Sequence, residues 1–480
     1  MEKIKLPKVE TVKSDKKFKN KKKILLLSDD LRMSSGVGTM SREFVLGTIH
    51  QYDWIQMGGA VKHPEEGKVV DMNESVRKDT GVKDANLKIY PISGYGNPDL
   101  VRQLLSVEKP DAILHYTDPR FWIWLYQMEH EIRQNIPIFY YNIWDDLPYP
   151  KYNQNYYESC DLIMNISRQT VNIVKNVCVN KPRNDWDNTY VPHGINEKFF
   201  FPITKENEHY KKMLDFEKQL FGKAKYDFVV FWNNRNIRRK LPGDVVYAFG
   251  QFCKMLGEKG KKVALVMHTA PVDNNGTDLP KLVEDLFPKH DNIYFSGEKL
   301  DNFQMSYLYN IADITVNIAS NEGFGLGTAE SLMAGTPIVV NVTGGLQDQC
   351  GFKKEDGSYL TVDDYTDEFQ SNHTGRYKDH GEWVKPIWPA CRSLQGSPPT
   401  PYIFDDRPKW EDLTEAIKYW YDMDTEKRKE CGAKGREFVQ REDIGMTAEH
   451  MSNRFIKDMD IALEKWTPRK RYSMYKVEEK

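Results

Sequence analysis

Residues 314–345 contain the residue types with the clearest chemical potential. A short apolar run, ITVNI, leads into a glycine-rich turn and then into a helix-like segment that begins near Thr328. Backbone N–H groups that lie ahead of a helix N-terminus, clear of side chains, bind phosphate through hydrogen bonds and the helix dipole. Gly323, Gly325 and Gly327 therefore predict a site for a diphosphate.

Two carboxylates flank this turn. Glu322 precedes the glycines, and Glu330 follows eight residues later in the first helical turn. Both positions face the crevice at the carboxyl end of a strand in an open α/β sheet. A carboxylate accepts two hydroxyl donors at once, which suits the vicinal hydroxyls of a sugar. Because a glutamate in a first helical turn also commonly compensates the helix dipole, the pair is informative only together with its surroundings.

The surroundings resemble a known family. EGFGLGTAE at 322–330, followed by AGTPIVV and TGG, is similar to the E-x7-E signature of retaining GT-B glycosyltransferases, glycosyltransferase family 4. The earlier segment VPHGIN resembles the family's entry into the second domain. Arg235 and Lys240 lie five residues apart and resemble its G-R-x4-K segment. Arg238 or Arg239 could take the place of the first arginine.

The resemblance implies roles for the matching residues. Glu330 would bind the ribose hydroxyls, and Glu322 with the amides that follow it would hold the donor sugar. Arg235, Lys240 and the helix start would neutralise the diphosphate, because arginine binds phosphate bidentately and lysine adds a point charge. The implied catalytic residues are Glu322, Arg235 and Lys240, and the implied donor-binding residues are Gly36, Gly38, Gly323, Phe324, Gly325, Leu326, Gly327, Thr328 and Glu330.

The first half of the chain contains looser counterparts. Ser35-Gly36-Val37-Gly38 resembles the family's G-G-x-G loop, with serine in place of the first glycine. The segment HYTDP resembles H-x-H-E-P, with threonine in place of the second histidine, so His115 fits a buried structural position equally well. Asp145 follows a strand-like run, where it lies either on the acceptor side or in an ordinary polar loop. The expected acceptor side comprises His115, Thr117, Asp118 and Asp145.

The resemblance also implies the reaction. A GT-B glycosyltransferase of this family moves a sugar from a nucleotide-diphosphate sugar, of UDP or GDP type, to a hydroxyl acceptor with retention and without a metal. The acceptor class stays open among glycan, lipid, protein and modified nucleic-acid base. The Asp-x-Asp pairs at 422–424 and 458–460 lie in helical stretches and not after a strand, where a magnesium-diphosphate site would form. We therefore expect no metal and no cofactor other than the nucleotide sugar as co-substrate.

Other functions fit less well. A glycosidase has no use for a glycine-rich diphosphate site. A dehydrogenase needs G-x-G-x-x-G, and Gly36-Val37-Gly38 lacks the third glycine. A nucleotide-sugar epimerase on the same fold and a non-catalytic nucleotide-sugar-binding protein remain as alternatives.

Strand-sized apolar runs alternate with helix-length segments along the whole chain. Such a pattern predicts parallel strands with helical crossovers, in an α/β fold of two facing Rossmann-like domains. A helical pattern near the end is free to return to the first domain. The expected parts are an N-terminal acceptor domain at 24–205, a nucleotide-sugar domain at 225–445 with an irregular insert at 351–401, and a C-terminal helix at 446–466.

Composition limits the function classes further. The chain has 480 residues, enough for two domains, and its net charge of -2 gives no global attraction to nucleic acid. No apolar run approaches the roughly 18 residues of a membrane span, and no signal peptide precedes the first strand, so we expect a cytoplasmic protein. The six dispersed cysteines predict reduced thiols. The basic tails at 1–23 and 467–480 are expected to be disordered, and the sequence leaves open their peripheral contact with an anionic membrane.

Overall fold

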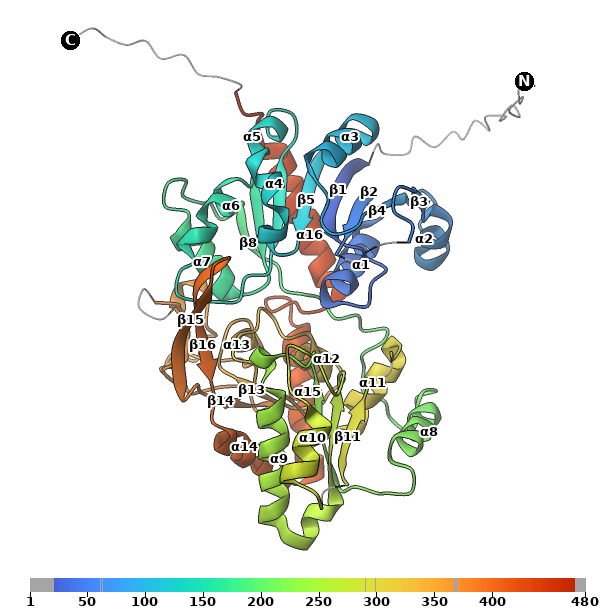
Figure 1. The fold of residues 1–480 in the computed structure, drawn as a ribbon, viewed down its shortest axis with the longest axis vertical. Helices are drawn as coiled ribbons and strands as arrows, with labels where there is room; N and C mark the ends of the chain where they lie inside the picture. Colours follow the sequence, from blue (N-terminus) through green and yellow to red (C-terminus); the bar gives the residue numbers. More distant parts are fainter. Residues whose placement is uncertain are drawn as a thin grey trace, which may run out of the picture.

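The computed structural model describes residues 21–60, 62, 64–289, 291–297, 299–366 and 370–470. Two α/β halves lie one above the other along the longest axis (Figure 1). Over the described residues, the upper half contains an eight-stranded sheet in the order β3-β4-β2-β1-β5-β6-β7-β8. The lower half contains a six-stranded sheet in the order β11-β10-β9-β12-β13-β14. The fold is GT-B, two facing Rossmann-like domains, as the sequence predicted.

The first sheet is parallel apart from its β3–β4 edge pair. The core strand β1 is buried on both faces, because helices cover both sides, and its apolar run at 24–27 is at most 1% exposed. The strands of this first sheet are β1 (Lys22–Asp29), β2 (Tyr52–Gly59), β3 (Val70–Asp71), β4 (Leu87–Pro91), β5 (Ala112–Tyr116), β6 (Ile138–Asn142), β7 (Leu162–Asn165) and β8 (Asn188–Tyr190). Its helices are α1 (Gly36–Thr48), α2 (Asn73–Thr80), α3 (Pro98–Glu108), α4 (Ile123–Gln127), α5 (Glu129–Ile132), α6 (Gln154–Glu158) and α7 (Arg168–Val177).

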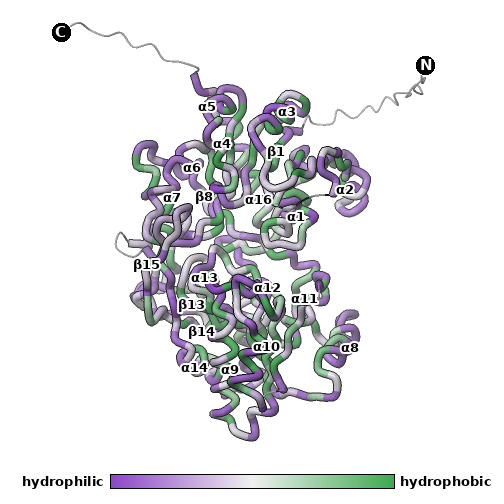
Figure 2. Tube along the Cα trace, viewed as in Figure 1, coloured by the Kyte–Doolittle hydropathy of each residue, from purple (hydrophilic) through white to green (hydrophobic). Residues whose placement is uncertain are grey.

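The second sheet has parallel neighbours throughout. Its strands are β9 (Phe228–Asn233), β10 (Val263–His268), β11 (Ile293–Ser296), β12 (Ile314–Asn317), β13 (Ile338–Asn341) and β14 (Val384–Ile387). Its helices are α9 (Pro242–Leu256), α10 (Leu279–Leu286), α11 (Asn302–Ile311), α12 (Leu326–Met333), α13 (Leu346–Gln349), α14 (Trp410–Asp422) and α15 (Thr425–Gln440). Figure 2 shows hydrophobic stretches toward the middle of each half, whereas the outlying α2 and α5 are largely hydrophilic.

Two helices connect the halves to each other. Helix α8 (Tyr210–Phe221) lies between the last strand of the first sheet and the first strand of the second. Helix α16 (Ala448–Lys465) returns to the first domain and packs on α1, where the rings of Phe44 and Phe455 stack with centroids 4.7 Å apart. Tyr52 Oη also donates to Asp460 Oδ1 at 2.7 Å. The predicted return of the C-terminal helix is confirmed (Figure 1).

The structure corrects the expectation of an irregular insert at 351–401. Residues 384–387 form β14, the edge strand of the second sheet. Its sequence, VKPI, did not suggest a strand because it contains Pro386, but an edge position tolerates the missing N–H. Farther along, β15 (Cys391–Ser397) and β16 (Thr400–Arg407) pair as an antiparallel hairpin.

The tails differ in part from the prediction. Lys22 and Lys23, assigned to the N-terminal tail, are the first residues of β1. Lys22 Nζ lies 2.9 Å from Asp111 Oδ1, so acidic partners explain why a lysine-rich run continues into a strand. The rest of that tail up to residue 20, and residues 471–480, lie outside the described part of the chain. None of the described helices is long and apolar enough to cross a membrane.

Candidate functional site

The glycine-rich turn lies where the strand order of the second sheet reverses. The chain runs outward from β9 to β11 on one side and from β12 to β14 on the other. Open α/β sheets bind their ligands in the crevice at such a point, which here is the carboxyl ends of β9 and β12. Gly325 caps α12 with a φ of +88°, and a Cβ there would lie 2.4 Å from Leu346 Cδ2. A side chain is excluded on both grounds. The glycines therefore leave the backbone of the turn clear of side chains directly ahead of α12, an arrangement in which amides and the helix dipole can bind a phosphate.

Glu322 lies in this crevice in an ion pair. Lys240 Nζ donates to Glu322 Oε2, and Asn317 Nδ2 donates to the same oxygen at 3.3 Å. The Lys240 and Glu322 side chains are only 8% and 13% exposed. Burial raises the pKa of Glu322, but Lys240 and Arg239 more than offset this and hold the pKa below its usual value. The carboxylate is therefore ionised and able to accept hydroxyl donors.

The structure distinguishes among the three arginines that the sequence left open, of which Arg238 is exposed. Arg235 is 67% exposed, and its Nε lies 3.2 Å from Asp273 Oδ2, away from Glu322. Arg239 Nη1 lies 3.5 Å from Asp145 Oδ2 and donates to the carbonyl of Asn321 at 2.5 Å. Arg239 thus takes the place beside Glu322 that the spacing assigned to Arg235.

A loop contact explains the position of Arg235. Asn236 Nδ2 donates to the carbonyl of Thr277 at 2.7 Å, and its Oδ1 accepts from the Thr277 amide at 2.9 Å. These bonds fix the turn after β9 against residues 273–277. The neighbouring Arg235 consequently points toward Asp273, whereas the following turn of 3-10 helix, Arg238–Lys240, brings Arg239 and Lys240 to the crevice.

Glu330 is held by a tyrosine that sequence reasoning missed. Tyr309 Oη donates to Glu330 Oε2 at 2.6 Å and accepts from Asn233 Nδ2 at 2.8 Å. Burial raises the pKa of Glu330 to about 7, against the lowering effect of the Tyr309 hydrogen bond. Because α11 and the end of β9 supply these partners, no spacing within the turn could have indicated them. A Cβ at Gly327 would lie 3.2 Å from both Asn233 O and Tyr309 Oη, so the helix start packs tightly against this group.

The two domains meet at Phe324. Its ring lies 5.1 Å from that of His193, which belongs to the VPHGIN segment. His193 Nδ1 lies 2.8 Å from Tyr141 Oη and Nε2 lies 3.5 Å from Tyr116 Oη. Burial lowers the pKa of His193 to about 3, against the effect of Glu322, so the imidazole is neutral. No separate role was predicted for this histidine from its segment.

The G-x-G loop of the first domain faces the start of α12. A Cβ at Gly36 would lie 3.5 Å from Leu326 Cδ1. Ser35, the departure from the family pattern, caps α1 by accepting from the Gly38 amide at 3.0 Å. A Cβ at Gly38 would lie 2.6 Å from Met33 O, so any side chain at this position would clash with the backbone. Serine therefore replaces glycine here because it stabilises the helix start.

His115 and Thr117 lie in the core of the first domain. His115 is fully buried, with Nδ1 2.7 Å from Tyr126 Oη and Nε2 3.3 Å from Thr117 Oγ1, and burial lowers its pKa to about 3. Thr117 Oγ1 accepts from Trp122 Nε1 at 2.7 Å. Asp118 caps the short helix that follows and pairs with Arg120. Over the described residues, none of these three predicted side chains contacts Glu322 or the glycine turn.

Asp145, in contrast, reaches the donor side. A Cβ at Gly323 would lie 3.7 Å from Asp145 Cβ and 2.8 Å from Ile166 Cδ1, so the glycine turn packs directly on the first domain. The neighbouring Asp146 is buried and accepts a hydrogen bond from Asn321. Burial, reinforced by Asp145, raises the pKa of Asp146 well above its usual value.

Asp29 is a further candidate that the sequence reasoning missed. It ends β1 at the crevice edge of the first sheet. Its Oδ1 is buried and has no hydrogen-bond partner among the described residues. Burial raises the pKa of its carboxyl to about 6, against a hydrogen bond with Ser35. The available signal was an acidic residue directly after the first strand.

The described residues do not form a metal site. Within that part of the chain, no group of three or more His, Cys, Asp or Glu side chains converges in a way that could hold a metal ion.

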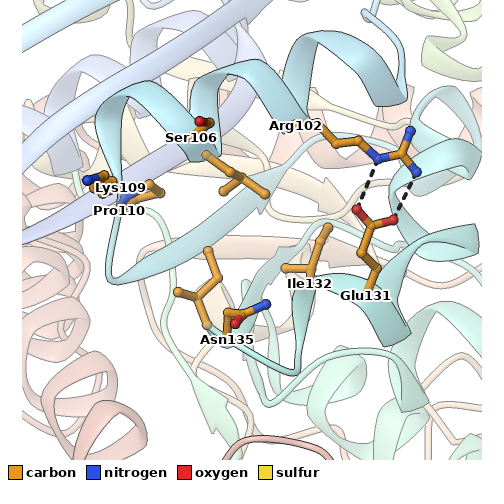
Figure 3. Close-up of a pocket in the computed structure, with 9 residues that line it drawn as sticks. Arg102, Ser106, Lys109, Pro110, Glu131, Ile132 and Asn135 are labelled. Atoms are coloured by element: carbon orange, nitrogen blue, oxygen red, sulfur yellow. Dashed lines mark hydrogen bonds and ion pairs between the residues drawn. The ribbon is translucent and has the colours of Figure 1, made fainter. Parts of the chain in front are cut away.

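A cavity of about 530 Å³ lies between α3 and α5, bridged by Arg102 and Glu131 (Figure 3). Pro110 and Ile136, which line it, precede β5 and β6. The cavity is therefore at the amino edge of the sheet, opposite the crevice.

Comparisons with known proteins agree with this GT-B architecture. Residues 272–365, which include both glutamates of the turn, match the family described as Glycosyl transferases group 1. The alpha-monoglucosyldiacylglycerol synthase of Acholeplasma laidlawii is 27% identical over 159 residues. Those residues are 33% of this chain and 37% of the relative, so the match spans little more than a third of that protein.

Solved structures resemble the chain over nearly its whole length. HepE of Anabaena in complex with UDP and glucose aligns with a TM-score of 0.62 at 12% identity, over 92% of this chain and 100% of that one. Sucrose-phosphate synthase of Thermosynechococcus elongatus aligns with a TM-score of 0.63 at 15% identity, over 92% and 100%. At these low sequence identities the similarity shows the fold alone, so a functional conclusion has to rest on the residues of the site.

Proposed function

We propose that this protein transfers a sugar from a nucleotide-diphosphate sugar to a hydroxyl acceptor, with retention of configuration and without a metal. The observation that carries the proposal is the buried Lys240–Glu322 pair beside the glycine turn, with Glu330 one helical turn further along the same crevice. The family match over residues 272–365 supports it. The chain would then be a member of glycosyltransferase family 4 with a working E-x7-E motif.

The donor would bind along the turn. Glu330 accepts hydrogen bonds from the ribose hydroxyls, and Glu322 with the amides of Gly323 to Gly325 holds the sugar hydroxyls. Lys240 and the amides at the start of α12 neutralise the diphosphate. A UDP sugar is the first choice, because UDP and glucose are bound in the similar HepE structure; a GDP sugar is the alternative.

The chemistry follows from where charge develops. As the bond between the anomeric carbon and the diphosphate oxygen breaks, negative charge grows on the leaving group. Preorganised cations and amides stabilise that charge and lower the barrier. The acceptor oxygen attacks the same face of the sugar, and its proton passes to the departing phosphate oxygen. No protein nucleophile is required, and Lys240 with Arg239 supplies the positive charge that a metal would otherwise supply.

The acceptor would approach from the first domain. Asp29 and Asp145 present carboxylates at the facing edge, and the Asp29 oxygen without a partner suits an acceptor hydroxyl. The Acholeplasma relative is named for a glucosyl lipid, so diacylglycerol belongs in an acceptor panel with oligosaccharides and modified bases. A cytoplasmic location, with basic tails on an anionic membrane, is part of the same proposal.

The test starts from binding. Thermal shift with UDP-glucose, GDP-mannose and ADP-glucose should identify one stabilising donor, and chromatography should then show nucleotide diphosphate released in the presence of EDTA. Magnetic resonance of the product should show the donor's anomeric configuration retained. An epimerase would alter the sugar with the nucleotide still attached, and a binding protein would release nothing. Either result would contradict the proposal.

A further inference from the structure

The β15–β16 hairpin connects the two domains. Its base is fixed to the second domain through Asp406, next to the end of β16. Asn341 Nδ2 donates to the Asp406 carbonyl at 2.7 Å, and Thr343 Oγ1 donates to its Oδ2 at 2.9 Å. The Asp406 amide donates to the carbonyl of Ser320 at 3.1 Å. The base therefore lies at the carboxyl ends of β12 and β13, beside the donor turn.

The middle of the hairpin lies against the first domain. Phe404 N donates to the carbonyl of Leu147 at 2.5 Å, and Tyr152 Oη donates to the carbonyl of Tyr402 at 2.8 Å. Tyr402 Oη donates to the carbonyl of Tyr149 at 3.1 Å. The rings of Tyr152 and Tyr402 meet edge to face, with centroids 4.9 Å apart. These partners all belong to the segment that follows β6, on the acceptor side of the crevice.

The tip also contacts the first domain. Arg120 Nη1, after β5, donates to the carbonyl of Pro399 at 3.3 Å. Leu394, which pairs with Phe404 across the hairpin, is 61% exposed. Figure 1 shows the hairpin in orange rising from the lower domain toward the upper one. A hairpin needed only for the stability of the second domain would not also make several hydrogen bonds across the domain boundary.

Asn321 links the hairpin to the donor site. This residue directly precedes Glu322, and its Nδ2 donates to the Phe404 carbonyl at 2.5 Å. The same group donates to Asp146 Oδ1 in the first domain. The donor turn, the segment after β6 and the hairpin therefore meet at one buried amide. Moving the hairpin would move the segment that holds Asp145 relative to Glu322.

We propose that the β15–β16 hairpin is the outer wall of the acceptor side and determines which acceptors, water included, reach the donor sugar. This rests on the proposed function. The hairpin spans the gap between the two carboxyl edges from β12 and β13 to the segments after β5 and β6. Tyr402 is a positioning residue of this wall, because its hydroxyl and carbonyl both bond to the first domain.

The experiment uses two variants of the full chain and one control. In the first, residues 395–403 are replaced by Asn-Gly, which closes a tight hairpin across the paired Leu394 and Phe404. The second is Tyr402→Phe, which removes the hydroxyl and keeps the ring. The control, Gln395→Ala, alters an exposed residue whose side chain bonds within the hairpin, to Ser393. UDP-glucose binding is measured by calorimetry, hydrolysis to UDP by chromatography and the radius of gyration by X-ray scattering.

We expect UDP-glucose affinity to stay within about twofold in all three. Hydrolysis should rise about fivefold in the shortened hairpin and about twofold in Tyr402→Phe, a modest lowering of the barrier to water attack. The shortened hairpin should also enlarge the radius of gyration. Unchanged hydrolysis would overturn the proposal, as would loss of binding and hydrolysis together in folded Tyr402→Phe. Failure of the wild type to bind any nucleotide sugar would instead refute the proposed function. In that case the radius of gyration of the shortened variant would still test whether the β15–β16 hairpin holds the two domains together.

Discussion

On the donor side of the crevice, Glu322, the glycine turn and Glu330 belong to one continuous strand–turn–helix unit. On the acceptor side, Asp29, Asp145 and the hairpin contacts come from segments scattered between residues 29 and 404. Covalent continuity holds the turn and its two glutamates together, whereas the contacts on the other side depend wholly on long-range packing. Under the proposed function, substitutions on the two sides should therefore separate donor binding from acceptor choice.

The largest effect should follow loss of the buried cation. Lys240→Met removes the positive charge beside Glu322 and the diphosphate, so turnover should fall about 100-fold or more. Single-turnover transfer measures this, and thermal denaturation checks that the variant is folded. Lys261→Met, in an exposed pair with Glu258, is the control. Turnover within twofold of wild type in Lys240→Met would place catalysis elsewhere.

The two arginines should differ in the order that the structure indicates. Arg239→Ala removes a charge close to Glu322 and Asp145, and turnover should drop about tenfold. Arg235→Ala removes an exposed contact with Asp273, and the change should be less than about threefold. Measuring the turnover of both variants under the same conditions distinguishes the two assignments. The reverse order would favour the assignment made from the motif spacing.

Donor affinity should depend on pH through Glu330. Its pKa of about 7 means that the carboxylate becomes ionised, and a better acceptor for ribose hydroxyls, as pH rises through 7. Affinity for the nucleotide sugar should rise by up to about tenfold between pH 6 and 8. Calorimetry at several pH values measures the change. Glu330→Gln should bind weakly at every pH, and a persisting pH dependence in that variant would assign the titration to another group.

The smallest effect on transfer is expected at His115. His115→Asn would leave Tyr126 and Thr117 without their buried partner, so the melting temperature should fall by about 3–6 °C. Transfer per folded molecule should stay within about twofold. His50→Asn, at an exposed position, should alter neither quantity. A large rise in acceptor KM with unchanged stability would return His115 to the acceptor side.

Much of the fold was predictable from the sequence. Strand-length apolar runs and the glycine turn are local signals, because buried parallel strands need unbroken hydrophobic residues and a phosphate-binding turn needs glycine. The strands β2 and β4 were not predicted, since YDWIQMGG and LKIYP mix polar and apolar residues. β14 was missed because its proline argued against a strand.

The turn from Glu322 to Glu330 could be predicted from the sequence alone, since each part of it lies within a few residues of the next. Packing was needed to establish which arginine lies near Glu322, which tyrosine hydrogen-bonds to Glu330 and which segments contact the β15–β16 hairpin. Tyr309, Asn236 and Phe404 exert their effects through contacts between distant parts of the chain. The packing of sheets and loops sets those contacts, and no spacing within a single segment encodes them.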